Sequence, residues 1–281
     1  MCLILLAWRA REDLPLVVAA NRDEWRERPT EPAHWWPDHP AIFAGRDQRA
    51  GGTWMGYARG GRFAAVTNFR DPSDRRSTAR SRGELVTDFL LSSESPDAFL
   101  SALHSRAAEY NGFNLLVADG RSLWYYGSRE GQAREIAPGV HGLSNHLLDE
   151  PWPKVVRGRE AMTRALDDAD PCPRLEAFLA DASLADDDAL PRTGVGADWE
   201  RRLSAALITG ADYGTLSSTT LLMDRVGRAK VRELTRDPEG RVITTASFDE
   251  ERIAHDRPPP SPSPVDGPPA GGLRDGGSRG R

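Results

Sequence analysis

The second residue of the chain, Cys2, carries the side chain best suited to nucleophilic chemistry. Removal of an initiator methionine is favoured when the next residue is small, as cysteine is. Cys2 would then hold a thiol and a free α-amine, whose ordinary pKa values are about 8.5 and about 7.7–8.0. Such an amine can accept the thiol proton, directly or through water, which is the chemistry of an amino-terminal nucleophile with its own base. The alternative from position alone is a small buried residue that starts a core strand.

A polar tetrad with the sequence NRDE, residues 21–24, follows the second apolar run of the chain, Leu16–Ala20. If this run pairs with the first one as a hairpin, the tetrad lies beside Cys2. Successive residues of a strand face opposite sides, so Asp23 and Arg22 would point to different faces. A carboxylate there would orient the α-amine, and a nearby arginine would lower the thiol pKa. The alternative is a solvated charged loop.

Composition narrows the classes of function. Of the 281 residues, 39% are apolar and 28% are charged, which predicts one large domain or two small ones. The net charge is −5 and no basic stripe is present, so we expect no nucleic-acid partner. No apolar run reaches the length of a membrane span, and the short apolar start lacks the positive region of a signal peptide. Two distant cysteines predict a reducing, cytoplasmic location.

The order of expected elements favours an α+β fold, because strands and helices occur in separate blocks. Strands are expected at 2–8, 16–20, 41–44, 53–57, 62–67, 114–118, 123–127, 139–143, 219–224, 230–234 and 242–247. Helices are expected at 81–91, 95–108, 152–168, 174–182 and 198–206, the first with a capping box at Ser81 and Glu84. The segment 257–281 holds 7 prolines and 6 glycines and is expected to be a disordered tail.

The cysteine and the tetrad together resemble the NRDE family, the relatives of transport and Golgi organisation protein 2. Further blocks agree in order: GGTW at 51–54, TNFR at 67–70, GLSN at 142–145, WPK at 152–154, YGT at 213–215 and SST at 217–219. That family is similar in pattern to cysteine N-terminal-nucleophile (Ntn) hydrolases such as penicillin V acylases and bile-salt hydrolases. The resemblance implies an αββα sandwich of two antiparallel sheets, formed here by a single domain over 1–256.

The resemblance also assigns roles at a candidate catalytic site. Cys2 matches the nucleophile, and Asp23 matches an aspartate that holds the α-amine. Asn68 and Asn145 match two asparagines that support the tetrahedral intermediate, with Asn145 as the expected donor to the oxyanion. Arg22 matches the arginine of the site less directly.

Two departures from the hydrolase pattern concern arginines. The hydrolases place an arginine three residues before the aspartate, where this chain has Ala20, so pleating could aim Arg22 away from the thiol. The family commonly has arginine after the YGT block, where this chain has Leu216, so a carboxylate clamp built on that residue would be missing.

The substrate side of the site is expected to include Asn21, Trp54, Trp36 and Tyr213. Trp36 lies in a segment flanked by His34 and His39, which suggests a rim loop over the site whose tryptophans contact an apolar ligand. The alternative is that these aromatic rings pack beneath a long loop.

Three functions are compatible with the sequence. The first is an amidohydrolase that cleaves a linear amide of an unidentified small molecule, without a cofactor or metal. The second, which the resemblance to the family implies, is a non-catalytic protein on the same fold that binds haem or a lipid or acyl-CoA and takes part in its trafficking. Cys172-Pro173 has the form of a haem-responsive motif, although a helix-stopping linker explains it more simply. The third is a catalytically inactive scaffold.

Overall fold

The first strand, β1 (Cys2–Trp8), is buried on both faces, and this sets the layers of the fold. The even-numbered residues from Ile4 to Trp8 pack into a core between two sheets. The odd-numbered residues from Leu3 to Ala7 pack against helices on the other side. A strand covered on both faces reads as a continuous apolar run, which is what residues 2–8 show.

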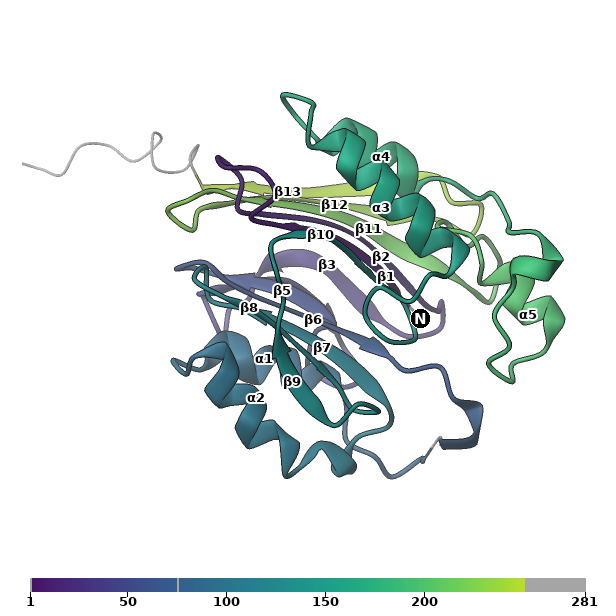
Figure 1. Cartoon of the computed structure of the whole chain (residues 1–281), viewed down its shortest axis with the longest axis horizontal. Coiled ribbons are helices and arrows are strands. Elements are labelled where there is room, and N and C mark those ends of the chain that lie inside the picture. The colour runs from purple at the N-terminus through teal and green to yellow at the C-terminus, as the bar shows by residue number, and fades with distance from the viewer. Residues whose placement is uncertain (1, 75, 251–281) are drawn as a thin grey trace, which may run out of the picture.

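Two antiparallel sheets lie face to face in the computed structural model, which describes residues 2–74 and 76–250 (Figure 1). The six-stranded sheet has the order β10 (Gly139–Leu143), β1, β2 (Leu16–Trp25), β11 (Tyr213–Met223), β12 (Ala229–Arg236) and β13 (Val242–Asp249). The seven-stranded sheet runs in chain order through β3 (Thr30–Trp35), β4 (Ile42–Asp47), β5 (Met55–Ala58), β6 (Arg62–Asn68), β7 (Phe113–Ala118), β8 (Leu123–Gly127) and β9 (Gln132–Glu135).

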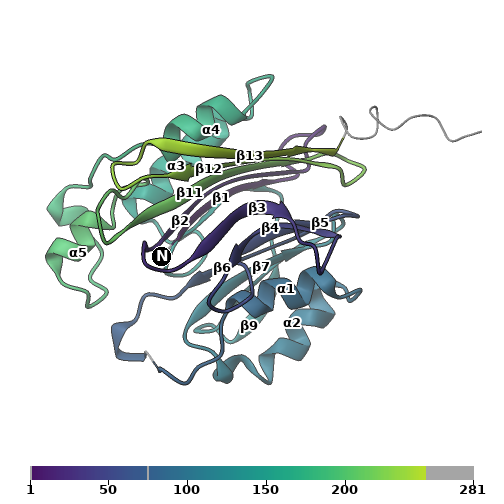
Figure 2. The same cartoon turned by 180° about the vertical axis from the view of Figure 1, so that it is seen from behind.

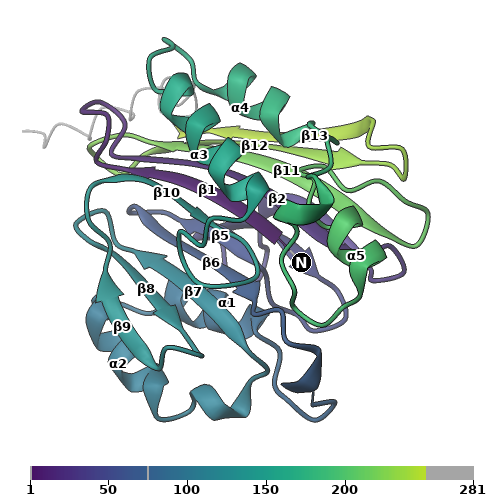
Figure 3. The same cartoon turned by 45° about the vertical axis from the view of Figure 1, so that its right-hand side comes forward.

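Helices cover the outer face of each sheet, which completes the four layers (Figure 2). The seven-stranded sheet packs against α1 (Gly83–Leu91) and α2 (Pro96–His104). The six-stranded sheet packs against α3 (Pro153–Ala165) and α4 (Cys172–Leu179). The short helix α5 (Ala197–Arg202) lies at the end of the sandwich where β1 begins (Figure 3). The expected α+β sandwich of two antiparallel sheets is confirmed. No helix in the described ranges is long and apolar enough to cross a bilayer.

Three local expectations are corrected. The NRDE tetrad does not follow β2 but lies inside it, because β1 and β11 pair with it on either side. The strands β3 and β9 are not foreseen, since neither alternates clearly between apolar and polar residues. The first helix begins at Gly83 and not at Ser81; its Glu84 forms an ion pair with Arg80 instead of a capping box. The expected tail at 257–281 lies outside the described residues.

The two glycines before β5 serve different purposes. Gly51 adopts a φ of 77°, and its N–H donates to the Asp47 carbonyl at 2.7 Å in the turn. Gly52 touches the start of α1: a Cβ on Gly52 would lie 2.6 Å from the carbonyl carbon of Gly83. This close approach lets the Thr53 N–H donate to the Gly83 carbonyl at 3.3 Å. The turn thereby fixes residues 53 and 54 against the helix.

Replacing Gly52 with alanine is expected to destabilise the protein. The added methyl group would meet backbone atoms, which cannot rotate away, and overpacking of this kind costs about 1–3 kcal/mol. The free energy of unfolding is measured by urea titration of the full chain. Ala50→Ser, at the exposed preceding turn, is the control and should change that free energy by less than about 0.5 kcal/mol. Equal midpoints for the two variants would contradict the close contact.

Candidate active site

The register of the first hairpin places Cys2 directly opposite Arg22. Residues opposite one another in an antiparallel pair share a face, so the Cys2 and Arg22 side chains lie on the same side of the sheet. That side faces the other sheet, as do Ile4 and Ala20 further along the two strands. Arg22 is therefore not aimed away from the thiol. Asp23 comes next in β2 and takes the opposite face.

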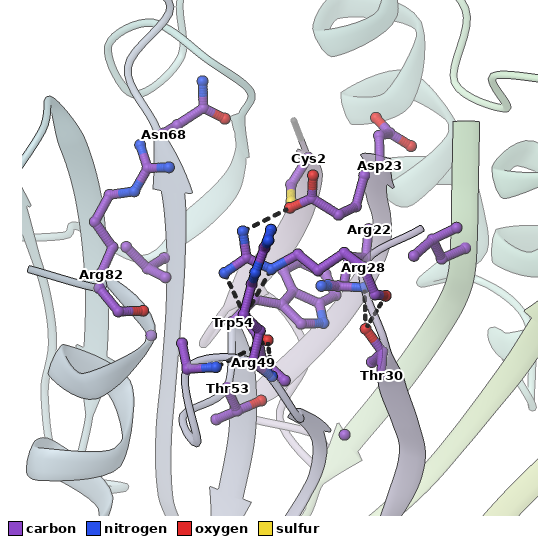
Figure 4. Close-up of a pocket in the computed structure, with 18 of the residues that line it drawn as sticks. Cys2, Arg22, Asp23, Arg28, Thr30, Arg49, Thr53, Trp54, Asn68 and Arg82 are labelled. Carbon is purple, nitrogen blue, oxygen red and sulfur yellow. Dashed lines mark hydrogen bonds and ion pairs between the residues drawn. The ribbon is translucent and has the colours of Figure 1, made fainter. Parts of the chain in front are cut away.

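The Cys2 side chain opens on a cavity of about 680 Å³ between the ends of the two sheets (Figure 4). The six-stranded sheet contributes Cys2, Arg22 and Leu216 to its wall, and the seven-stranded sheet contributes Asn68, while Trp54 comes from the turn before β5. Cavities of this size hold small organic ligands. The position where the family commonly has an arginine is thus an apolar part of the wall, at a β-bulge of β11.

Cys2 is 8% exposed, and the environment of its thiol opposes ionisation of that group. Burial raises the pKa of the Cys2 thiol, and the nearby Asp23 charge raises it further. The charge of Arg22 and the backbone N–H of Asp23 act in the opposite direction. At neutral pH the resting group is therefore a thiol, and attack on a substrate needs a base that removes its proton.

Asp23 is buried behind the nucleophile, with 1% of its surface exposed. Its Oδ1 accepts a hydrogen bond of 2.7 Å from the Thr215 hydroxyl, which itself accepts one of 2.9 Å from the Ile208 N–H. Burial raises the pKa of Asp23, whereas the charge of Lys154 and the bond from Thr215 lower it. The carboxylate is thus held rigidly at the end of the hairpin where the Cys2 main chain begins.

The two predicted asparagines contact each other, and one of them lies closer to the cavity than the other. Nδ2 of Asn145 donates to Oδ1 of Asn68 at 2.9 Å and to its carbonyl at 3.2 Å. Asn145 is completely buried, and Asn68 lines the cavity. Within the described part of the chain, Nδ2 of Asn68 makes no hydrogen bond, so it is the amide group available to a ligand. Asn145 lies behind it with its Nδ2 donated to Asn68, and its expected role as the donor to the oxyanion stays a prediction.

The loop that carries Asn145 is tied to the nucleophile. The Ser144 hydroxyl donates to the Cys2 carbonyl at 3.1 Å, just beyond the pairing of β10 with β1. The Arg70 guanidinium lies 4.6 Å from the centre of the Trp152 ring and pairs with Glu200 at 2.7 Å. These contacts hold the loop before α3 against the end of β1.

Two of the four expected substrate contacts, Asn21 and Trp36, do not line the cavity. Asn21 is completely buried on the helix side of β2, where its Nδ2 donates to the carbonyls of Leu179 and Ala206 at 2.9 and 2.7 Å. Trp36 is also buried, and its Nε1 donates to the Ala44 carbonyl at 3.0 Å within the core under α1 and α2. Both residues hold layers together. The segment around Trp36 is not a rim loop.

The other two expected contacts differ from each other. Trp54 is half-buried and lines the cavity. Tyr213 does not line it and packs edge-on against Trp25 and Trp199 at ring distances of 5.3 and 5.5 Å. Burial raises the pKa of Tyr213, and the charges of Asp23 and Cys2 raise it further, which places this ring beneath the site. Cys172 is distant from the cavity, packs in the core under α3 and α4, and has a thiol pKa raised to about 11 by burial.

Lys154 is a site residue that the sequence analysis did not single out. It is 1% exposed at the second position of α3, and its pKa is lowered to about 8 by burial, against the opposing charges of Asp23 and Cys2. One signal was available: this chain has only two lysines among its 37 basic residues, and one of them lies in the WPK block. In residues 2–74 and 76–250, no group of three His, Cys, Asp or Glu side chains is arranged to hold a metal ion.

Similar proteins agree with this architecture. The structure of penicillin V acylase from Agrobacterium tumefaciens superposes with a TM-score of 0.51 at 11% identity, covering 89% of this chain and 87% of the acylase. This likeness shows a shared Ntn-hydrolase-like fold.

Sequence comparison gives the family. The Transport and Golgi organization protein 2 homolog of Bos taurus is 35% identical over 274 residues, or 88% of this chain and 99% of the relative. The homolog of Homo sapiens is 33% identical over 255 residues, or 83% and 92% of the two chains. The family described as Transport and Golgi organisation 2 matches residues 1–238. This chain belongs to that family.

Proposed function

We propose that this protein is an N-terminal-cysteine amidohydrolase that cleaves a linear amide of a small molecule. The observation that carries the proposal is the opening of Cys2 onto a cavity whose walls also hold Arg22 and Asn68, with the largely buried Asp23 at its edge. A nucleophile, a charged neighbour, an amide donor and an anchoring carboxylate thus surround one point. The proposal requires that Met1 is removed, because only then does Cys2 carry an α-amine.

In the proposed reaction, the α-amine takes the proton of the Cys2 thiol as the sulfur attacks the carbonyl carbon of the amide. The new C–S bond moves one electron pair onto the carbonyl oxygen, and Nδ2 of Asn68 donates to that oxyanion. Collapse breaks the C–N bond, and the α-ammonium returns its proton to the leaving amine. Water, deprotonated by the α-amine, then cleaves the thioester and releases the acid and the thiol. Asp23 holds the amine in place throughout.

The charged residues of the cavity wall indicate which charge the substrate carries. Eight arginines and five acidic residues line it, so its formal charge is positive. Arg49 stands out among them, because its side chain makes no ion pair or hydrogen bond within the described residues. This excess favours a substrate that bears a carboxylate or phosphate. The same feature favours the second candidate, non-catalytic binding of haem or of a lipid or acyl-CoA, all of which carry such groups.

Cys2 is expected to be the reactive group of the purified protein. Intact mass should show loss of Met1, and 2-cyanobenzothiazole, which condenses only with a thiol and amine on one residue, should label Cys2. Cys2→Ala should abolish hydrolysis in a panel of N-acyl amides, whereas Cys172→Ala should leave it unchanged, since Cys172 packs in the helix-side core. Retained Met1, or full turnover by Cys2→Ala, would refute the mechanism and leave the binding function.

Asn68→Ala is expected to lower kcat by about 10²–10³-fold with little change in KM, as removal of an oxyanion donor does elsewhere. Asn145→Ala should give a smaller loss, because Asn145 acts by holding Asn68 through the 2.9 Å bond. Steady-state kinetics of both variants on one amide gives the comparison. If Asn145→Ala were the more damaging of the two, the donor would be Asn145, as the sequence suggested.

Arg49→Gln is expected to raise KM several-fold for an amide that bears a carboxylate, without changing kcat. The reason is that Arg49 offers its charge to the cavity and has no role in the proposed reaction steps. An uncharged amide of the same length is the control substrate and should show the same KM in both proteins. An equal rise in KM for both substrates would mean that Arg49 shapes the cavity and does not bind the carboxylate of the substrate.

A further inference from the structure

The loop between β10 and α3 is closed at its base by one residue, Asp149. Its N–H donates to the Gly142 carbonyl at 2.8 Å, and its Oδ1 accepts the Gly142 N–H, also at 2.8 Å. Asp149 has a φ of 64°, a left-handed conformation that Asp and Asn adopt more readily than most residues. The chain therefore turns back onto β10, and both main-chain groups of Gly142 are paired although β10 is an edge strand.

His141, the preceding residue of β10, completes this closure through both nitrogens of its ring. Nδ1 lies 2.7 Å from Oδ2 of Asp149, and Nε2 lies 3.0 Å from the carbonyl oxygen of Ala137. A carboxylate and a carbonyl oxygen only accept hydrogen bonds, whereas a neutral imidazole has one N–H to donate. Both contacts are therefore satisfied only by the imidazolium ion, which donates from each nitrogen.

The charged groups that face His141 agree with this protonation state. Asp149 comes from the loop, and Arg159 comes from α3, where its Nε lies 3.8 Å from Oδ1 of Asp149; β1 places the apolar Leu6 opposite His141. The hydrogen bond to Asp149 raises the pKa of His141 above its ordinary value of about 6.5, and the Ala137 carbonyl adds to this rise, while burial and the Arg159 charge oppose it. Burial would raise the pKa of Asp149, but the hydrogen bonds it accepts lower that pKa.

The closed loop carries two residues that contact the candidate active site. The Ser144 hydroxyl donates to the Cys2 carbonyl at 3.1 Å, and Nδ2 of Asn145 donates to Oδ1 of Asn68 at 2.9 Å. Residues 146–148 alone separate these contacts from Asp149. The closure at the base of the loop therefore governs where the loop meets the nucleophile.

We propose that His141 and Asp149 are positioning residues for the proposed active site, in which an imidazolium–carboxylate pair holds the loop 144–148 against the end of β1. This inference rests on the proposed function, which gives the end of β1 its nucleophile. Neither residue lines the cavity, so both act through the loop and do not touch the substrate. Charge-assisted hydrogen bonds are shorter and stronger than neutral ones, which suits a pair that must fix a loop.

The pair is expected to respond to pH in one direction. A histidine whose pKa is raised in the folded protein contributes stability that is fully present below about pH 6.5 and is lost as the pH rises through the raised value. Above that value the ring keeps one N–H, so one of its two contacts is lost. Because the pKa of Asp149 is lowered, the carboxylate stays charged throughout this range. The loop should therefore loosen as the pH rises.

The first experiment observes the ring of His141 in the full chain. The chain has six histidines, and His141→Gln identifies the ring signals of His141 in protein labelled with ¹⁵N at histidine. We expect its titration midpoint above pH 6.5, with both ring N–H protons protected from exchange on the acid side of that midpoint. A midpoint at or below 6.5, or one unprotected ring N–H, would overturn the proposal.

Asp149→Asn is the matched variant, because it removes the charge and keeps the closure. Asparagine tolerates the same φ and keeps an oxygen for the Gly142 N–H. Its amide group can donate to Nδ1 of a neutral imidazole, whose Nε2–H still reaches the Ala137 carbonyl. In this variant the midpoint of His141 should fall by about one unit, a tenfold lower proton affinity.

The second experiment asks whether the charge of the pair acts on catalysis. The ratio of kcat between the parent and Asp149→Asn is measured on one amide from pH 5.5 to 9. The thiol and the α-amine titrate in both proteins, so their effects divide out. The ratio should fall with the midpoint found for His141, which a role in folding alone would not produce. A ratio that is constant with pH would refute the positioning role.

Asp149→Ala removes the closure itself. Alanine is strained at this φ and offers no acceptor to Gly142 or His141. We expect kcat to fall by about 10²-fold with a smaller change in KM, the loss that a misplacement of about 1 Å produces. A variant that folds and keeps the parent kcat would contradict the proposal.

A measurement on the unsubstituted protein covers the case in which these variants do not fold. The Gly142 amide is bonded to Oδ1 of Asp149, so its hydrogen exchange reports the closure. After correction for the intrinsic effect of pH, its protection should fall as His141 loses its proton, whereas the amides of β2, inside the sheet, keep theirs. Constant protection at Gly142 across the titration would show that the pair does not hold the loop.

These outcomes are separable from the fate of the proposed function. The ring titration and the amide exchange need no substrate and no thiol. If both behave as expected but Cys2→Ala still hydrolyses amides, the proposed reaction fails and the closure by His141 and Asp149 stands. If Cys2 is the nucleophile but the ratio of kcat does not follow His141, the reaction stands and the positioning role fails.

Discussion

The register of β1 against β2 is the constraint on which the site depends. Because Cys2 pairs with Arg22, the sulfur and the guanidinium share the face that looks onto the cavity, and Asp23 is placed one step further on the other face. A slip of one residue would exchange these faces and move the whole apolar set of β1 to the wrong layer. The register is therefore fixed by burial on both sides of the strand, independently of the contacts at the site.

This arrangement divides the chemistry between two environments. The cavity side holds the sulfur and Asn68, which the proposed reaction would bring against its substrate. Asp23, at the edge of this cavity, and Lys154 are both about 1% exposed, so water screens their charges little. Cys2, the first residue of β1, belongs to both environments. Its side chain enters the cavity, and its main-chain nitrogen is at the end of the strand beside Asp23. A two-layer sheet with helices outside is what makes such a division available.

Sequence reasoning reached the parts of the site that local pattern controls. The hairpin, Cys2 and Asp23 follow from two apolar runs, a charged turn and the tetrad, and the antiparallel layers follow from the order of the elements. The sequence could not show which side chains reach the cavity and which are buried between layers. Periodicity tells which face a residue takes, but not whether that face meets a cavity or a helix. It therefore cannot reveal that Asn21 and Trp36 hold layers together through hydrogen bonds to main-chain carbonyls. The order of Asn68 and Asn145 likewise depends on a contact between distant segments.

Burial raises the pKa values of both the Cys2 thiol and the Asp23 carboxyl, so the interior opposes the charges that the proposed reaction would use. A cluster that contained only these two acids would be neutral at rest and poorly reactive. Lys154 acts against this trend, because its charge lowers the pKa of Asp23 and so favours the carboxylate form. The carboxylate is the form of Asp23 that the proposed reaction needs in order to hold an α-amine, so the burial of these groups and their charges have to be considered together.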